Sequence, residues 1–378
     1  MNTPIDFFDQ TPDRLAKAIA AWGMPAYRAE QIFDWVYRKS TCDPQQMTNL
    51  AKADRHTISE HLKFSTGRIV RQQSASDGTQ KLLIEWSNNA TSKPSLGNGA
   101  GPRHRGSGRA ECVLIPSQSD PKPRRTACVS SQFGCPVGCR FCASGLEGLE
   151  ANLTTGQIVE QVWQLNRLTV DLKSSAQEVA SRGVSHIVFM GMGEPLSNFQ
   201  SVTDAIRTLV ADWGMGLSAR RITVSTVGLP AQIRRLADLG LPVTLALSVH
   251  APNDQIRRNL IPWAEYVTID QLIEAGQYFF QRTGREVTLE YTLLANVNDH
   301  PEHARELASV AKRLRSNINL IRYNQVAELP YRRPTDTSVH QFQRILRRAG
   351  VNAHIRASRG RDIAAACGQL RIEEKAAK

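Results

Sequence analysis

The most regular hydrophobic pattern of the chain begins near residue 127, where short apolar runs alternate with longer segments whose apolar residues recur every three or four positions. Short apolar runs between polar residues are typical of buried strands, and the longer periodicity predicts amphipathic helices. The expected strands span 127–131, 186–190, 221–225, 243–249, 287–294 and 318–323. The expected helices span 155–168, 199–213, 230–239, 269–282 and 303–315.

This alternation predicts an α/β fold with right-handed crossovers and a parallel sheet. Six strand–helix units are too few for a complete eight-stranded barrel. We therefore expect a partial (β/α)6 TIM-like barrel or an open sheet. In either architecture, ligands bind at the carboxyl ends of the strands and in the loops that follow them.

The flanking regions have other patterns. The first 60 or so residues predict helices, and two apolar runs at 81–86 and 111–116 predict a β-hairpin. Between these runs, 87–110 is rich in Gly, Ser, Asn, Pro and Arg, which is typical of a flexible insertion. A helix at 339–348, a short strand at 353–357 and a loop with Cys367 follow the barrel. The expected division is 1–65 (helical accessory domain), 66–126 (small β element with the insertion), 127–325 (partial barrel) and 326–378 (C-terminal extension).

The positive net charge of the chain favours polyanions as binding partners. The chain has 47 Lys and Arg against 35 acidic residues and a net charge of +12, and arginine doublets such as Arg257-Arg258 recur through its patterned part. Such a field favours nucleic acid as a partner, although solubility alone would also account for it. The chain start lacks the basic and apolar regions of a secretory leader. No run reaches the roughly 18 apolar residues of a membrane span. We expect a cytoplasmic protein without membrane association.

Three of the seven cysteines lie within eight residues: Cys135, Cys139 and Cys142 form a CxxxCxxC loop. Gly134 and Gly138 allow its backbone to curl, so the three thiols can point at one centre. Clustered thiolates select zinc or an iron–sulfur cluster. A structural zinc site needs a fourth ligand, and no second CxxC or HxxxH follows. A cluster with one open iron is the preferred interpretation.

Several polar residues end the predicted strands. Gly191-Met-Gly193-Glu194 follows the second strand, and its glycines would let the backbone approach a ligand while Glu194 accepts a hydrogen bond from a cationic amine. An ordinary strand–helix turn would look similar. Ser225 ends the third strand and Ser248-Val249-His250 ends the fourth. Each of these sites lies where barrel proteins hold ligands.

The CxxxCxxC loop after the first barrel strand resembles that of the radical S-adenosylmethionine (SAM) superfamily. Four further motifs resemble the RlmN/Cfr family of RNA adenosine methyltransferases, and so do Met24-Pro-Ala-Tyr-Arg28 and Gln31-Ile-Phe-Asp-Trp35 in the N-terminal helices. The four motifs are Cys128-Val-Ser-Ser-Gln132, Gly191-Met-Gly-Glu-Pro-Leu196, Ser248-Val-His250 and Ala364-Ala-Ala-Cys-Gly-Gln369. The resemblance runs almost to the end of the chain. It implies a radical SAM partial barrel whose [4Fe-4S] cluster is held by Cys135, Cys139 and Cys142.

The resemblance also implies site roles. Cys367 would accept a methyl group from one SAM, and a second SAM would be cleaved reductively to activate that methyl group. Cys128 would then form a transient disulfide with Cys367, releasing the RNA, and Glu111 would accept a proton from the base. The implied SAM contacts are Gly193, Glu194, Ser225, Ser248, Val249, His250 and Asn324.

The implied activity is methylation of C2 of an adenosine in 23S rRNA, and of the purine beside the anticodon in tRNA. The implied partners are a flavodoxin- or ferredoxin-type electron donor and a thiol reductant, with the enzyme a monomer. A second hypothesis is a Cfr-like enzyme that methylates C8 of the rRNA adenosine, or a paralogue with another RNA target, because 143–148 departs from the usual RlmN pattern. A third is a non-catalytic, metal-stabilised RNA-binding protein, against which Cys128 and Cys367 argue, since a passive binder needs neither.

Overall fold

The computed structural model of the chain describes residues 4–87, 108–117, 124–169 and 183–371. Most of the expected 87–110 insertion therefore lies outside the described residues. No helix within the described ranges is long and apolar enough to cross a membrane.

A ten-stranded sheet organises the chain, in the order β14-β13-β12-β11-β10-β9-β6-β5-β4-β3. Seven neighbouring strands of this sheet are parallel. They are β6 (Arg124–Cys128), β9 (His186–Phe189), β10 (Ile222–Thr226), β11 (Thr244–Ser248), β12 (Val287–Leu293), β13 (Ser316–Arg322) and β14 (Ala353–Arg356). The six expected strands are present, and the short strand expected in the C-terminal extension joins them as a seventh, β14.

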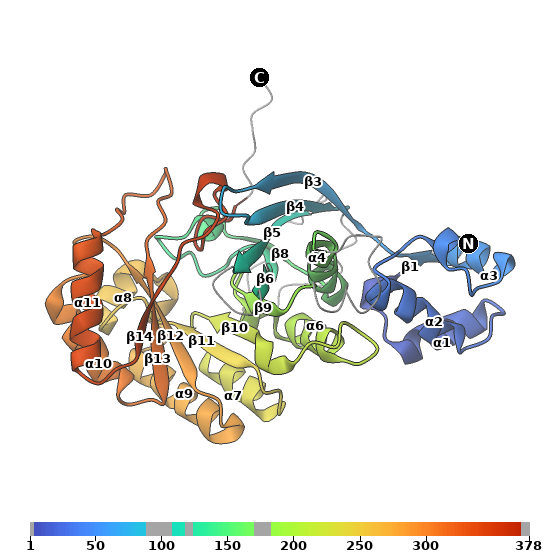
Figure 1. Cartoon of the computed structure of the whole chain (residues 1–378). Helices are drawn as coiled ribbons and strands as arrows, with labels where there is room; N and C mark the ends of the chain where they lie inside the picture. The colour runs from blue at the N-terminus through green and yellow to red at the C-terminus, as the bar shows by residue number, and fades with distance from the viewer. Residues whose placement is uncertain (1–3, 88–107, 118–123, 170–182, 372–378) are drawn as a thin grey trace.

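Helices cover the outer face of the parallel strands (Figure 1). They are α4 (Thr155–Arg167), α6 (Phe199–Val210), α7 (Pro230–Asp238), α8 (Asp254–Leu260), α9 (Ile269–Thr283), α10 (Pro301–Ala311) and α11 (Asp336–Arg348). Helix α4 begins with a capping box: the Thr154 hydroxyl accepts from the Gln157 amide, and the Gln157 side chain accepts from the Thr154 amide. The short helix α8 was not predicted.

The sheet curls rather than lying flat. In the sheet order, four strands separate β14 from β9, yet Arg356 at the end of β14 donates to the sulfur of Met190, just after β9, at 3.4 Å. A side chain can bridge these positions only if the two ends of the parallel sheet turn toward each other. The partial barrel that the sequence predicts is confirmed.

The predicted β-hairpin is also confirmed. It consists of β4 (Gln80–Trp86) and β5 (Gly108–Ser117), with β3 (Gly67–Ser74) on its outer side. Because β5 pairs antiparallel with β6, the hairpin extends the barrel sheet. Residues of the hairpin thereby reach the site at the first barrel strand.

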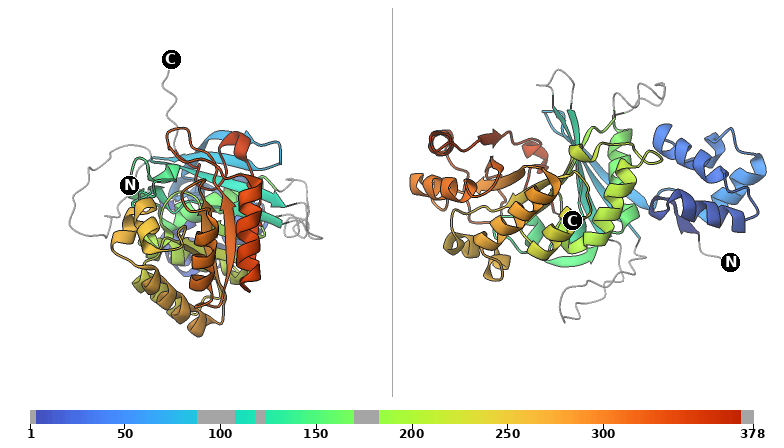
Figure 2. Two further views of the ribbon diagram at one scale, coloured as in Figure 1. Left: turned by 90° about the vertical axis from the view of Figure 1, so that its left-hand side faces the viewer. Right: turned by 90° about the horizontal axis from the view of Figure 1, so that it is seen from below.

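The N-terminal part is helical, with α1 (Pro12–Ala21), α2 (Arg28–Phe33), a π-helical turn (Asp34–Arg38) and α3 (Lys52–His61). A short parallel pair, β1 (Ile5–Asp6) and β2 (Leu62–Lys63), brings its two ends together. This N-terminal part lies to one side of the barrel, next to α4 (Figures 1 and 2).

Buried contacts join this N-terminal part to α4. The Trp163 indole donates to the carbonyl of Val36, and the Gly156 amide donates to Asp9. Glu160, fully buried on α4, accepts from the Trp86 indole, the Gly67 amide and the hydroxyls of Ser65 and Thr66. This carboxylate therefore connects α4 to the segment that leads from the N-terminal helices into β3.

Candidate active site

The cysteine loop lies between two short paired strands, β7 (Gln132–Gly134) and β8 (Leu149–Asn152). The Cys135 amide donates to the carbonyl of Gly148 at 2.8 Å and closes the loop. Gly134 has a φ of +74°, and a Cβ there would lie 2.0 Å from the Gly148 oxygen. Glycine is therefore required at this position by both backbone conformation and space.

The three thiols face a mainly apolar environment. Cys135, Cys139 and Cys142 pack against a cluster that includes Val137, Phe141, Leu260, Ile261 and Leu294. Burial raises the pKa of all three thiols, that of Cys135 to about 12. Cys142 also raises the pKa of both Cys135 and Cys139, and Cys135 that of Cys139, so the three lie close together. Three sulfur ligands therefore lie close together in apolar surroundings. Such a place suits a positively charged metal group, because its charge would stabilise the thiolate forms that burial disfavours.

Several donors also surround the sulfurs. The amides of Val137 and Gly138 favour the Cys135 thiolate, and the Ser144 amide and hydroxyl favour that of Cys142. Such hydrogen bonds to sulfur tune iron–sulfur clusters. In the part of the chain that the structure describes, no three His, Cys, Asp or Glu side chains are arranged to hold a single metal ion. The fit to a cluster therefore rests on the donor set and its surroundings.

Arg257 on α8 supplies a positive charge near Cys139. Its guanidinium is fully buried and donates to the carbonyls of Val227 and Val267. The interpretation of this arginine as part of a basic surface is wrong, because its guanidinium lies in the interior and both of its terminal nitrogens donate to buried backbone carbonyls. Of the two arginines of this doublet, Arg258 is the exposed one.

Glu194 is buried between the ends of β9 and β10. Its two carboxylate oxygens accept from the amides of Leu196 (3.0 Å) and Val227 (2.8 Å), and burial raises its pKa to about 7. The turn before it packs tightly: a Cβ on Gly193 would lie 2.7 Å from the Ser131 hydroxyl oxygen. The glycine thus permits close packing of the turn against the strand, rather than only approach to a ligand as expected. Within the described residues, that buried Ser131 hydroxyl has no hydrogen-bond partner, which suits a site meant for a polar ligand.

The other strand-end residues lie together on neighbouring strands. The hydroxyls of Ser225 and Ser248 are 3.3 Å apart. His250 is buried with a φ of +53°, its Nδ1 accepts from the Thr292 amide, and burial lowers its pKa to about 3. The imidazole is therefore neutral at physiological pH, and its hydrogen bond to the Thr292 amide fixes its orientation. Val249, fully buried, precedes it.

The Cys367 loop is tied directly to the cysteine loop. The Ala143 amide donates to the carbonyl of Gly368 at 2.8 Å, and the Ser144 hydroxyl donates to the carbonyl of Leu370 at 2.7 Å. On its other side, the Asn324 amide group donates to the Cys367 carbonyl at 3.1 Å. The structure thus places Cys367 and Asn324 beside the thiols that are expected to hold the cluster.

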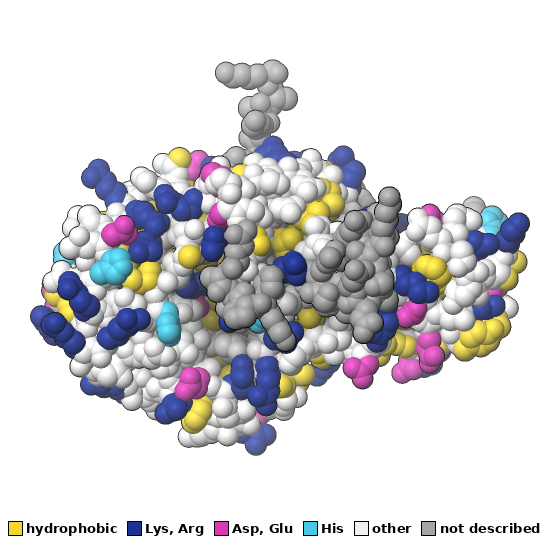
Figure 3. Space-filling view, in the orientation of Figure 1, with side chains coloured by type: hydrophobic (Ala, Val, Ile, Leu, Met, Phe, Trp, Pro, Cys, Tyr) yellow, Lys and Arg dark blue, Asp and Glu magenta, His cyan; other side chains and the backbone are white. Residues whose placement is uncertain are grey.

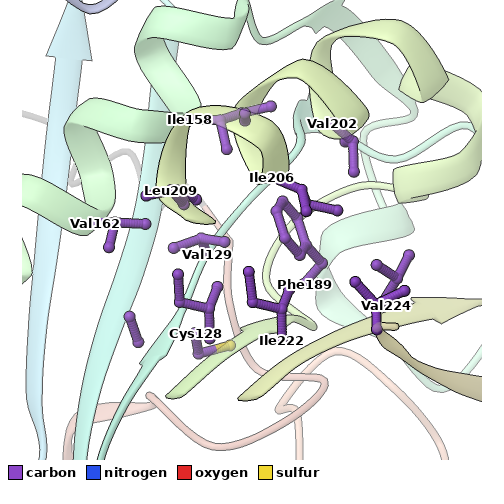
Figure 4. Packing of buried hydrophobic residues seen from close by; sticks show 14 of the residues in the cluster. Cys128, Val129, Ile158, Val162, Phe189, Val202, Ile206, Leu209, Ile222 and Val224 are labelled. Carbon is purple, nitrogen blue, oxygen red and sulfur yellow. The ribbon is translucent and has the colours of Figure 1, made fainter. Parts of the chain in front are cut away.

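Cys128 is the last residue of β6 and is the thiol that interacts with Cys367. It packs beside Val129 and Ile222 of the hydrophobic core (Figure 4). Burial raises its pKa to about 12, and the charge of Cys367 contributes in the same direction, so the two sulfurs interact. The Cys367 side chain is solvent-accessible, yet the protein around it raises the pKa of its thiol to about 11. Arg356 lowers the pKa of both thiols and forms an ion pair with buried Glu290 at 3.4 Å.

Glu111 is a buried residue of β5, not a surface acid. It forms an ion pair with Lys81 at 2.9 Å, and its other oxygen accepts from the Arg371 amide at 3.0 Å. Its own carbonyl accepts from the Ser130 hydroxyl, two residues after Cys128. The expected proton acceptor therefore lies between the first barrel strand and the C-terminal loop.

Three charged residues of this region escaped the sequence interpretation: Lys81, Glu290 and Arg356. Each lies in or beside an apolar segment, where a charge is unusual and signals a specific partner. That signal is present in the sequence, but it does not identify the partner.

Known proteins resemble the chain over nearly its whole length. A sequence profile described as the Radical SAM superfamily matches residues 129–308, and one described as the ribosomal RNA large subunit methyltransferase N-terminal domain matches residues 5–63. A protein of Gloeobacter violaceus, named a probable dual-specificity RNA methyltransferase RlmN, is 42% identical over 98% of this chain and 96% of its own length. A protein of the same name from Thermosynechococcus vestitus is 43% identical over 95% of this chain and 97% of its own.

A solved structure agrees with these relatives. The crystal structure of a radical SAM methyltransferase from Sphaerobacter thermophilus is 40% identical, superposes with a TM-score of 0.86, and covers 98% of this chain and all of its own. The cysteine loop, the curled sheet and the N-terminal helices thus occur together in one architecture. The chain belongs to the RlmN family of radical SAM RNA methyltransferases, enzymes whose cofactors are a [4Fe-4S] cluster and SAM.

Proposed function

We propose that this enzyme methylates C2 of an adenosine in 23S rRNA, and of the purine beside the anticodon in tRNA, with Cys367 as the methyl carrier. The observation that supports this most is the pair of thiols, Cys128 and Cys367, beside the cysteine loop and facing Arg356. Direct transfer of a methyl group from the sulfonium of SAM requires a nucleophilic acceptor atom. C2 of adenine is not nucleophilic, so it cannot accept the methyl group in this way. A thiol carrier and a second, resolving thiol answer this difficulty.

Cys135, Cys139 and Cys142 would hold the cluster. Gly193, Glu194, Ser225, Ser248, Val249, His250 and Asn324 would hold SAM. When bound, these cofactors supply the methyl group and a radical that activates it; the protein contributes binding, orientation and exclusion of water. The buried Glu194 carboxylate suits an ammonium group, since its two amide donors leave lone pairs on both oxygens.

Cys367 acts first as a nucleophile and later as the electrophilic sulfur. As thiolate it accepts the methyl group. One hydrogen of that methyl group would pass to the radical that the bound cofactors supply, and the freed valence of the methyl carbon would then bond to the base. The Cys128 thiolate next attacks the Cys367 sulfur, so that an S–S bond forms and the bond from that sulfur to the transferred carbon breaks. The electron pair of the broken bond leaves with the base, and the transferred carbon takes up a proton to become the product methyl group. Arg356 favours both reactions because it stabilises the thiolate forms against the effect of burial. A thiol reductant must then restore both cysteines.

Glu111 accepts the proton that the ring carbon must lose. The Lys81 ammonium forms an ion pair with it at 2.9 Å. The third hypothesis, a passive RNA-binding protein, does not fit a member of this enzyme family.

Charge on the surface suits RNA. Lys and Arg side chains are spread over the barrel half of the face in Figure 3. Near the Cys367 loop, Arg333 donates to the Tyr323 carbonyl and lies within the electrostatic influence of Arg322 and Arg361. The N-terminal helices form an accessory domain that binds the folded RNA around the target base. The base itself must unstack from its neighbours to reach the site. The enzyme acts as a cytoplasmic monomer with a flavodoxin- or ferredoxin-type donor.

Nucleoside mass spectrometry of 23S rRNA and tRNA tests this proposal, after reaction of the reconstituted enzyme with methyl-labelled SAM. The expected product is 2-methyladenosine. A labelled 8-methyladenosine would support the Cfr-like alternative, and an unlabelled RNA pool would overturn the proposal.

A further inference from the structure

Lys81 contacts two parts of the site at once. Its ammonium lies 2.9 Å from Glu111 Oε1 and donates to the carbonyl of Ala364 at 3.2 Å. Lys81 is 6% exposed and Glu111 5% exposed, so neither contact is a loose surface pair. Ala364 is three residues before Cys367. One side chain therefore joins the expected proton acceptor to the loop of the expected methyl carrier.

The strand geometry explains how Lys81 reaches both. It lies on β4, and Leu83, two residues along, is directly opposite Glu111 on β5. Lys81 and Glu111 are therefore diagonal neighbours on one face of the hairpin. Ala364 has a left-handed backbone with a φ of +50°, in the segment that turns across this face.

A separate set of contacts secures the same loop without Glu111. In the turn between β3 and β4, the Asp77 carboxylate accepts from the Gly360 amide at 3.0 Å, and the Ser76 amide donates to the Asp362 carboxylate at 2.9 Å. A Cβ on Gly360 would lie 2.8 Å from the Thr79 side chain, so the loop and the turn touch closely. The loop can thus be loosened at Asp362 while the Lys81–Glu111 pair is left intact.

We propose that Lys81 is a positioning residue that fixes the Glu111 carboxylate and the Cys367 loop in one geometry, so that the carboxylate meets the ring proton only when the methyl-carrying sulfur is in place. The inference rests on the proposed function for the roles of Glu111 and Cys367. The step involved is a proton transfer alone: the C–H bond of the ring breaks, its electrons stay with the base, and Glu111 gains the proton. No oxidant or reductant takes part.

Three full-length variants test this: Lys81→Met, Lys81→Arg and, as a matched control, Asp362→Ala. Each reacts with RNA carrying hydrogen or deuterium at C2 of the target adenosine. Lys81→Met should release methylated RNA at least tenfold more slowly, accumulate the covalent protein–RNA adduct, and show a larger isotope effect than the wild type, because proton removal becomes slow (a factor of ten is about 1.4 kcal/mol). Asp362→Ala should leave the isotope effect unchanged. Lys81→Arg should restore part of the rate.

A second readout needs neither RNA nor cofactor. The Ala365 amide donates to the Gly360 carbonyl at 2.8 Å, so its hydrogen exchange reports the order of the loop. Exchange should accelerate in both Lys81→Met and Asp362→Ala. Unchanged exchange in Lys81→Met, or an isotope effect equal to that of the wild type, would overturn the inference. If the wild type methylated no RNA, the proposed function would fall, while the exchange comparison would still decide whether Lys81 secures the loop.

Discussion

Replacing Glu194 with glutamine tests how strongly the buried turn after β9 disfavours a charge. In the folded chain, burial raises the pKa of this carboxyl from its ordinary 4.5 to about 7, against the opposing effect of the amides of Val227 and Leu196. Since one pKa unit corresponds to about 1.4 kcal/mol, ionised Glu194 costs the folded state about 3 kcal/mol relative to the unfolded chain.

The sign follows from proton binding. Because the pKa is raised, the folded protein holds this proton more tightly than the unfolded chain does, and the resulting stabilisation is complete below pH 4.5. It is lost as the pH rises through about 7. From about pH 5.5 to about pH 8.5, wild-type protein should therefore lose about 2 kcal/mol of unfolding free energy relative to Glu194→Gln, which carries no charge at either pH.

Urea denaturation of the cluster-free protein, followed by circular dichroism, measures this difference. The exposed Glu150→Gln variant, on β8, controls for the removal of one negative charge. The amide nitrogen of a glutamine would face one of the two backbone donors, which lowers the stability of the variant equally at every pH, so the quantity compared is the change across the pH range. Parallel stability curves for wild type and Glu194→Gln, within about 0.5 kcal/mol across the range, would refute the reasoning.

Four further outcomes are expected. Anaerobically reconstituted protein should contain about four irons and four sulfides per chain, by metal and sulfide analysis, and a single zinc would contradict the cluster. Cys128→Ala should accumulate a covalent protein–RNA adduct on denaturing gels, whereas release of free RNA at the wild-type rate would remove its resolving role. Cys367→Ala should transfer no label from methyl-labelled SAM to RNA, and retained transfer would exclude it as carrier. RNA affinity should fall steeply with salt in filter binding, and Arg333→Ala should reduce the logarithmic salt slope by about one if that guanidinium contacts a phosphate.

The sequence predicts well what is local. The cysteine loop needs only eight residues, and the α4 capping box only four, so their patterns can be recognised without the fold. The strands of the barrel are likewise visible, because a strand buried on both faces, such as β12, is apolar along most of its length.

Contacts between distant segments could not be predicted in the same way. Lys81 and Ala364 are 283 positions apart, and Arg356 and Glu290 are 66 apart. The pattern shows that a charge stands in an apolar run, but pairing depends on how the hairpin and the C-terminal extension lie against the barrel. The place of β14 at the edge of the sheet was missed for the same reason: a four-residue strand carries too little pattern to indicate its neighbour.

The contact between Arg356 and Met190 also has a consequence for how the enzyme is made. A ribosome completes the cysteine loop and most of the barrel long before it adds residues 353–371, which bring Arg356 and Cys367. On the roles proposed above, a nascent chain therefore contains the three cysteines expected to hold the cluster before it contains the proposed methyl carrier, Cys367. If Cys367 is the methyl carrier proposed above, a chain that stops before residue 353 is expected to contain Cys135, Cys139 and Cys142 but neither Arg356 nor Cys367.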